Sequence, residues 1–359
     1  MAKRTATLTP KPTKGAKRAK SALRTEPLSS EALFTLGEQH ALVEAEVLRR
    51  PSARNRSPYV ADIRVAGREA ICHVPSLDLG GKCVAGSTIL VKPCAEINHH
   101  AIEQASRRWR GGDASIRMRR KTMISTQVKP ALDTKGNLVG PDAVNPKYGT
   151  PKCEFHCQLA KLPGGGWVGA HPSLGERAAV ALLQRSPVLG DVWTGAREKA
   201  EIRREVTGPR GQDMRADFVV SGSEKDCVLE VKTVVDASAD AGVGAEEEES
   251  GPTAALFPWG SKNQKGPDGE KVVSARAIKH VDALAAIAKE GVASAAVLFV
   301  CARNDCSSFR PHAARCPSFA AHLKDAKKAG VTLVARRIRW DVRDGVAHAF
   351  DDGAIPVDV

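Results

Sequence analysis

The sequence has no long apolar run. Its 359 residues include no stretch of 18 or more apolar residues, so we expect no segment that spans a membrane. The N-terminus lacks the apolar core of a secretory signal, and no basic amphipathic helix with bulky apolar anchors is evident. We therefore expect an intracellular protein without a membrane partner.

Aromatic residues are also scarce, and basic residues outnumber acidic ones. Phe, Trp and Tyr make up 4% of the chain, and 41 Asp and Glu face 54 Lys and Arg, which gives a net charge of +13. An excess of this size favours a polyanionic partner, of which nucleic acid is the commonest. With so few aromatic rings, we expect contacts to the phosphate backbone to outweigh base stacking.

The nine cysteines are odd in number and scattered, and several lie inside apolar runs. This pattern indicates reduced, buried thiols in an intracellular protein and not a disulfide framework. One group of Cys and His has the spacing C-x4-C-x5-H-x3-C, which lacks the two-residue gap of a usual zinc site, so zinc is not expected there. That group is Cys301, Cys306, His312 and Cys316.

Residues 1–30 form a basic tail. The first 25 residues contain eight Lys and Arg and no acid, and such a segment cannot bury a core. Three interpretations stay open: an organelle (plastid or mitochondrial) transit peptide, a nuclear-type basic arm, or a plain disordered tail. The compartment depends on which of these interpretations holds: an organelle, the nucleus or, without a targeting signal, the cytoplasm.

Three further regions follow from the pattern of strands and turns. Residues 37–93 hold short alternating strands separated by glycines, which predicts a small OB-like β-barrel. Residues 94–150 are basic and turn-rich, so we interpret them as an insertion or linker. It is either a solvated loop or an extra nucleic-acid contact with Trp109.

Residues 151–359 alternate strands with helices of 12–18 residues. This predicts an α/β (α+β) domain with a central mixed sheet covered by helices. The first helix carries Ser173 as its predicted cap with Glu176 three residues on, a capping box. We expect the second helix to end at Gly291, and VTLVARRIRW to be the last long strand. The role of residues 236–271, with the acidic run at 246–250, stays open.

Charged residues interrupt two apolar strands of this domain. RADFVV contains Asp217, and LEVKTV contains Glu230 and Lys232, which point to the same face because they are two residues apart. Buried charges must pair or coordinate something. Two carboxylates can hold Mg²⁺ or Mn²⁺, and the lysine can act on an attacking water or on the charge at phosphorus.

The simpler alternative is a buried structural ion pair between Lys232 and an acid. The acid-x-Lys pattern also occurs at Asp133/Lys135, in a turn-rich segment, and at Asp325/Lys327, on a helix surface. Of the three pairs, Glu230/Lys232 alone lies in an apolar strand that follows an Asp-bearing strand.

The helix that starts near residue 274 carries a cationic cluster. Arg276, Lys279 and His280 fall at i, i+3 and i+4, hence on one face, where they could clamp phosphates or form a solvated basic face. Glu176 is either a third carboxylate of the site or part of the capping box.

These motifs resemble the sugar fermentation stimulation protein family. The resemblance covers residues 150–359 and, more loosely, the N-terminal strands. It implies an OB-fold barrel followed by a nuclease domain of the PD-(D/E)xK type, DNA binding, and a Mg²⁺ or Mn²⁺ centre. The family's R-x-D-F motif matches at Arg215 and Asp217, E-V-K at Glu230, Val231 and Lys232, R-x-x-K-H at Arg276, Lys279 and His280, and H-x-P at His73 and Pro75.

On this resemblance, Asp217, Glu230, the Val231 carbonyl and Glu176 are the expected metal ligands. Arg215 joins the helix cluster as a phosphate contact. The sequence departs from the family in three places: Trp259 stands where an Asp is expected, with Asp268 nearby, Glu176 replaces an Asn, and PSLD replaces a barrel turn.

The favoured hypothesis is therefore a DNA-binding protein with a metal-dependent phosphodiesterase centre. The alternative is a non-catalytic DNA-binding or regulatory protein that keeps the nuclease fold. A carbohydrate-processing enzyme is a third class, which a deep apolar pocket would reveal. The oligomeric state stays open, with a homodimer among the options.

Overall fold

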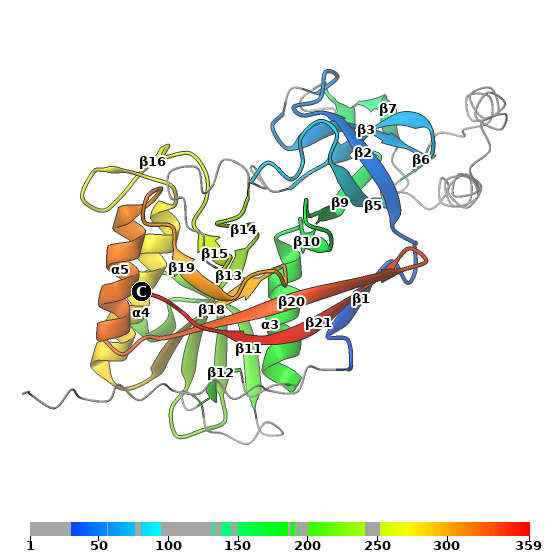
Figure 1. Cartoon of the computed structure of the whole chain (residues 1–359). Helices are drawn as coiled ribbons and strands as arrows, with labels where there is room; N and C mark the ends of the chain where they lie inside the picture. The colour runs from blue at the N-terminus through cyan, green and yellow to red at the C-terminus, as the bar shows by residue number, and fades with distance from the viewer. Residues whose placement is uncertain are drawn as a thin grey trace, which may run out of the picture.

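The computed structural model describes most of the two predicted domains (Figure 1). It covers residues 30–55, 57–75, 80–94, 131–132, 138–144, 149–185, 188–190, 193, 200–240 and 252–359. The basic tail, most of the segment 94–150 with Trp109, the pair Asp133/Lys135 and the acidic run at 246–250 lie outside these residues. The predictions made for them stay predictions.

The N-terminal barrel has five strands and is closed. Its order is β2-β3-β4-β9-β5, with β5 returning to β2, and β4 and β9 run parallel while the other neighbours are antiparallel. Numbered along the chain, this is the order 1-2-3-5-4-1 of an OB-fold. The strands are β2 (Val43–Arg49), β3 (Val60–Val65), β4 (Arg68–His73), β5 (Thr88–Pro93) and β9 (Phe155–Lys161).

The predicted boundaries of the barrel need correction. The barrel does not end at residue 93, because β9 pairs with β4 and β5 and so closes the wall from beyond the 94–150 segment. After β9 the chain turns at residues 164–166 into β10 (Trp167–Gly169). A small sheet of β6 (Ala131–Leu132), β7 (Leu138–Val144) and β8 (Pro151–Lys152) precedes β9.

The second domain is built on a seven-stranded mixed sheet with the order β1-β21-β20-β18-β13-β12-β11. Its centre, β13, β18 and β20, is parallel, and the flanking strands are antiparallel. The strands are β1 (Phe34–Leu36), β11 (Glu201–Thr207), β12 (Arg215–Ser221), β13 (Cys227–Val234), β18 (Ser294–Cys301), β20 (Thr332–Arg343) and β21 (Val346–Ile355). The mixed sheet predicted from the sequence is confirmed, but the last long strand is β21.

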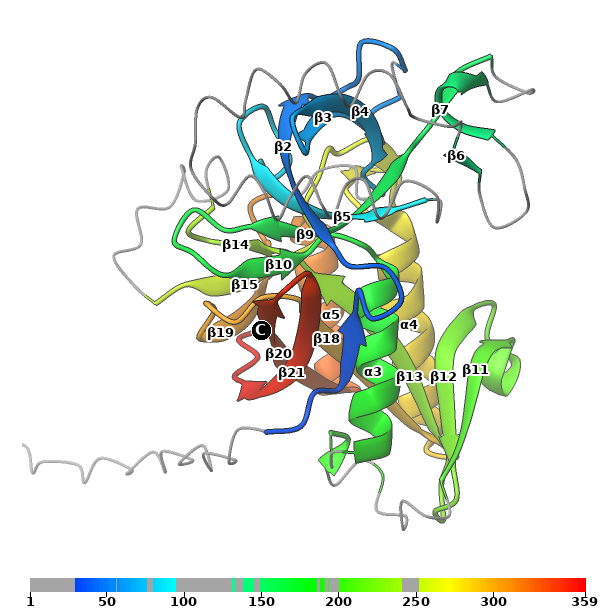
Figure 2. The ribbon, with the colours of Figure 1, turned by 90° about the vertical axis from the view of Figure 1, so that its right-hand side faces the viewer.

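Three helices cover the two faces of this sheet (Figures 1 and 2). α3 (Ser173–Arg185) packs on one face with Leu229 of β13, and α4 (Ala275–Glu290) and α5 (Pro317–Lys328) pack on the other with Val228. α4 begins and ends as its sequence predicts: the Ser274 side chain accepts a hydrogen bond from the Ala277 N–H, and Gly291 takes a left-handed conformation.

Shorter elements complete the domain. Beside the sheet lie two small strand groups and one 3₁₀ turn. They are β14 (Asp236–Ala237), β15 (Ala254–Phe257) and β19 (Ser308–Pro311), the hairpin β16 (Gln264–Lys265) and β17 (Lys271–Val272), and η4 (Pro209–Gly211). In the described part of the chain, no helix is long and apolar enough to cross a membrane. None of the nine cysteines, all of which the structure describes, is assigned to a disulfide.

A buried charge network joins the barrel to the second domain. Lys82, from the barrel, lies 2.9 Å from Asp236 and 2.7 Å from Asp240, and its side chain is 2% exposed. Arg303 contacts Asp240 at 2.7 Å and Asp305 at 2.6 Å from the opposite side. Because Asp236 and Asp240 directly follow β13, the network fixes the barrel at the end of the strand that carries Glu230 and Lys232.

Candidate functional site

The predicted carboxylates meet where β12 and β13 separate. Strand pairing ends at Phe218 and Leu229, and beyond it Asp217 Oδ2 accepts a 2.7 Å hydrogen bond from the Val231 N–H. An extended residue directs its N–H and C=O to the same edge of a strand. The Val231 carbonyl therefore faces the Asp217 side.

Glu230 lies at the centre of the site and is almost fully buried, with 2% of its side chain exposed. Its Oε1 accepts hydrogen bonds from Lys232 Nζ and, at 2.6 Å, from the His280 ring. Its Oε2 is buried and has no hydrogen-bond partner among the described residues. A buried oxygen without a partner is destabilising by about 1–3 kcal/mol, so Oε2 is an open ligand position.

A chain of hydrogen bonds orients Glu230 from α4. Arg276 Nε donates to His280 Nε2 at 3.4 Å, which leaves Nδ1 as the protonated nitrogen that donates to Glu230. Burial opposes ionisation of Glu230, but the His280 hydrogen bond and the Lys232 charge outweigh it and lower the pKa of the carboxyl. His280 is 4% exposed and is placed to position Glu230, while its predicted contact with phosphate stays a prediction.

Asp217 has the opposite electrostatic setting. Burial and the nearby Glu230 carboxylate raise the pKa of Asp217 to about 6, against the Val231 hydrogen bond and the Lys232 charge. Glu176 adds to the rise, so a third carboxylate lies close by. Two carboxylates with unlike pKa values and one open oxygen form a place where an added positive charge is stabilising.

These groups fit a divalent cation with hard oxygen preferences. Within the described residues, no three His, Cys, Asp or Glu side chains gather into a complete metal cage. Mg²⁺ does not need one, because it keeps several waters and binds through one or two carboxylates. Asp217, Glu230 and the Val231 carbonyl can supply such a set.

Glu176 comes from α3, which packs on the face of the sheet opposite α4. The predicted capping box is wrong: Ser173 lies inside the helix with its hydroxyl 2.7 Å from His171 Nδ1, and Glu176 is 3.6 Å from Arg204. α3 can approach β13 closely because residue 175 is a glycine. A Cβ at this position would lie 1.8 Å from Thr233 Oγ1. Glu176 therefore stands at the edge of the site, half exposed.

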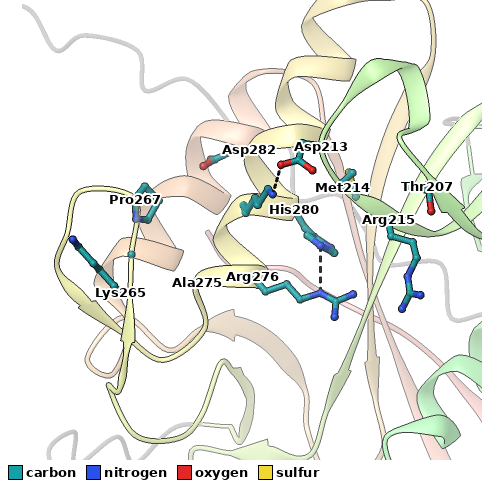
Figure 3. A pocket seen from close by; sticks show the side chains of 12 residues that line it. Thr207, Asp213, Met214, Arg215, Lys265, Pro267, Ala275, Arg276, His280 and Asp282 are labelled. Carbon is teal, nitrogen blue, oxygen red and sulfur yellow. Dashed lines mark hydrogen bonds and ion pairs between the residues drawn. The ribbon is translucent and has the colours of Figure 1, made fainter.

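A cleft of about 800 Å³ opens beside His280 (Figure 3). Four cationic side chains line it against two carboxylates. The cations are Arg215, Lys265, Arg276 and Lys279, and the acids are Asp213 and Asp282. Lys279 is paired with Asp213 at 2.6 Å, and Arg215 with Glu205 at 2.8 Å. The cationic excess and the open shape suit a polyanion, and the cleft is not the deep apolar pocket of a carbohydrate-processing enzyme.

Three charged residues of this cleft, Asp213, Lys265 and Asp282, were missed from the sequence. Asp213 precedes the R-x-D-F strand, where a lone acid gives no signal. Lys265 belongs to the 236–271 segment, and the β16–β17 hairpin brings it over the start of α4. Trp259, the departure from the family pattern, stacks on His312 with ring centroids 5.2 Å apart and lies under Arg315. Asp268 lies in the β16–β17 turn.

The comparisons with known proteins agree with this architecture. The model of the sugar fermentation stimulation protein RE domain matches residues 267–344. The homolog of Synechococcus elongatus is 31% identical over 169 residues, 46% of this chain and 56% of its own. That of Alkalilimnicola ehrlichii is 30% identical over 187 residues, 51% of this chain and 66% of its own.

The chain belongs to the sugar fermentation stimulation protein family. The structure of Pyrococcus furiosus SfsA in complex with Ca²⁺ covers 92% of this chain and 100% of its own, with a TM-score of 0.58 and 17% identity. The predicted fold, an OB barrel followed by a nuclease-like α/β domain, is therefore confirmed. The aligned segment spans little more than half of the Synechococcus relative.

Proposed function

We propose that this protein binds nucleic acid, DNA in the first place, and hydrolyses its phosphodiester bonds with Mg²⁺ or Mn²⁺. The observation that carries the proposal is Glu230 Oε2, a buried carboxylate oxygen without a described partner, next to Asp217 and beside a cationic cleft. The Pyrococcus structure is a complex with Ca²⁺, a cation that prefers the same oxygen ligands as Mg²⁺.

Each residue of the site has a role in this proposal. Asp217, Glu230 and the Val231 carbonyl would hold the metal, with Glu176 at its edge. A bound Mg²⁺ supplies a Lewis acid that polarises a phosphoryl oxygen. Lys232, 12% exposed, would hold the attacking water or stabilise negative charge at phosphorus.

The phosphates themselves would be bound from the cleft. Arg276 and Lys279 on α4 and Arg215 on β12 present guanidinium and ammonium groups there. His280 keeps Glu230 in place, and through its second nitrogen it also holds Arg276.

A second candidate is a DNA-binding protein without catalysis. Two observations favour it: Lys232 Nζ is paired with Glu230 Oε1, and Trp259 replaces an acid of the family pattern. In that case Asp217, Glu230 and Lys232 would act as a buried structural network.

Cleavage assays separate the two candidates. Labelled single-stranded, double-stranded and branched DNA and RNA are incubated with Mg²⁺ or Mn²⁺, and wild type is compared with Glu230→Gln. Asp325→Asn is the matched control, because Asp325 and Lys327 repeat the acid-x-Lys pattern on the surface of α5. We expect metal-dependent cutting that falls at least about 100-fold in Glu230→Gln and is unchanged in Asp325→Asn. No cutting of any substrate, with salt-sensitive binding retained, would refute the nuclease proposal.

A further inference from the structure

A row of basic side chains crosses three neighbouring strands on the outside of the barrel. The strand register places Lys92 of β5 opposite His156 of β9, and His156 beside His73 of β4. Cross-strand partners point to the same face. That face is the outer one, because successive residues of a strand point to opposite faces and the residue before each of the three belongs to the barrel core. These preceding residues are Val91, Phe155 and Cys72.

The row is compact and reachable from solvent. The Nδ1 atoms of His73 and His156 are 3.3 Å apart, with the rings nearly perpendicular at 86°. Lys92 and His156 are exposed, and His73 is half-buried. Neighbouring strands lie about 5 Å apart, so the row extends over roughly 10 Å.

The charged neighbours of these histidines are all basic. Burial, followed by His73, His171 and Lys92, lowers the pKa of His156, and burial followed by Arg50 lowers that of His73. In the described part of the chain, no carboxylate contributes to either shift. A cluster of basic groups without an acid is destabilising by itself and is relieved by an anion.

We propose that Lys92, His156 and His73, with Arg50 and His171 beside them, bind the phosphodiester backbone of a nucleic-acid strand that continues to the carboxylate site. Ammonium and imidazole N–H groups donate to phosphate oxygens in charge-assisted hydrogen bonds. The inference rests on the proposed function for its second half, the continuation to Asp217 and Glu230.

His171 connects the row to the carboxylate site. It lies in the short loop between β10 and α3, and the next residue, Pro172, accepts a 3.4 Å hydrogen bond from Thr233 Oγ1. Thr233 directly follows Lys232 on β13. A strand bound along the row would therefore be led by the start of α3 towards Lys232.

A linear array suits a strand better than a single phosphate. Tyr59, 37% exposed, directly precedes Val60, which pairs with His73. An exposed aromatic ring beside basic groups can stack a base. OB barrels bind single strands with this combination of basic groove and aromatic side chain.

The test is binding of a fluorescein-labelled 20-nucleotide oligo-dT, measured by fluorescence anisotropy in EDTA, so that cleavage plays no part. Lys92→Ala should reduce the slope of log K against log salt by about 1. Lys328→Ala on α5, far from the barrel, removes the same charge and should leave the slope unchanged. An unchanged slope in Lys92→Ala would overturn the proposal.

A His73→Ala/His156→Ala variant adds a pH readout. Wild-type affinity should rise as the pH falls from 8 to 5, because a bound phosphate favours the protonated imidazoles. In the free protein, burial followed by the neighbouring basic groups disfavours them and lowers the pKa of His156 to about 4. The double variant should lose most of this rise, and a rise as large as in wild type would contradict the role of the imidazoles. If the double variant does not fold, Lys92→Ala still decides.

Two further outcomes are informative. Inorganic phosphate competing at the same concentration as the phosphates of the oligonucleotide would indicate an anion pocket and overturn a strand site. Normal binding by the row variants together with Glu230-dependent cleavage would leave the proposed function standing and remove the row. Weakened binding by the row variants, without cleavage of any substrate by wild type, would support the row and remove the proposed nuclease activity.

Discussion

The buried network around Lys82 makes a quantitative prediction. Lys82→Ala removes an ammonium whose side chain is 2% exposed and which lies within 3 Å of both Asp236 and Asp240. Asp236 and Asp240 are themselves buried, and Asp240 keeps a second cation in Arg303, at 2.7 Å.

The magnitude follows from these contacts. Removing one partner of a buried ion pair typically destabilises a protein by 3–5 kcal/mol, because a buried charge loses its compensation. Since Arg303 still balances Asp240, we expect the lower end, a loss of about 3 kcal/mol in the free energy of unfolding. Lys82→Met/Asp236→Asn should recover part of this loss, because it removes both charges of one contact.

The assay is urea unfolding followed by tryptophan fluorescence, with wild type, Lys82→Ala and the double variant. Lys328→Ala serves as control, because Lys328 and its partner Asp325 are 67% and 72% exposed, and no measurable change is expected. A loss below about 1 kcal/mol in Lys82→Ala would refute the reasoning, since the network would then be no more than a surface ion pair.

Two further predictions concern the carboxylate site. Mg²⁺ should raise the thermal unfolding midpoint at pH 7.5 and hardly at pH 5, because Asp217, with its pKa raised to about 6, holds a proton below that pH and cannot then bind a cation. Equal shifts at both pH values, or an undiminished shift in Asp217→Asn, would contradict this. His280→Ala should weaken Mn²⁺ binding about 10–100-fold in calorimetric titrations, as Glu230 loses an orienting donor, and His280→Asn, which keeps an N–H near Nδ1, should recover part of it. Unchanged affinity in His280→Ala would show that Glu230 needs no such support.

Local rules in the sequence predicted the elements that carry the site. The two apolar strands with embedded charge were predicted from the sequence, and in the structure they are β12 and β13, which pair beside Asp217 and Glu230. The cap at Ser274 and the left-handed Gly291 bound α4, and both signals lie within a few residues of the helix. Such features depend on residues close together in the sequence and can therefore be predicted without knowing the fold.

Long-range pairing could not be predicted in the same way. β9 resembles any alternating strand, and its place in the barrel depends on a register with β4 and β5 across the 94–150 segment. β11 is an edge strand whose residues are mostly exposed, so EIRREVT lacks the apolar alternation that marks β2 or β3. Neither contact leaves a periodic signal.

The depth of a side chain is a third property that periodicity does not give. Arg276, Lys279 and His280 share a helical face by spacing, and the sequence assigned them one role. The structure separates them, because α4 lies on the sheet at the level of Glu230: His280 is buried against that carboxylate, while Lys279 is more than half exposed. The spacing of residues determines which face of the helix they share, but the burial of each side chain depends on how the helix packs against the sheet.

The same reasoning explains why the barrel and the carboxylate site should be considered together. Lys232, Thr233 and Asp236 follow one another along β13 and just beyond it. The first contacts Glu230, the second the loop of His171, and the third the barrel residue Lys82. A segment of five residues therefore carries the site, the connection to the basic row and the attachment of the barrel. Since packed strands and buried ion pairs do not deform continuously, the spacing between the row and the carboxylates is set by the fold and not by the bound strand.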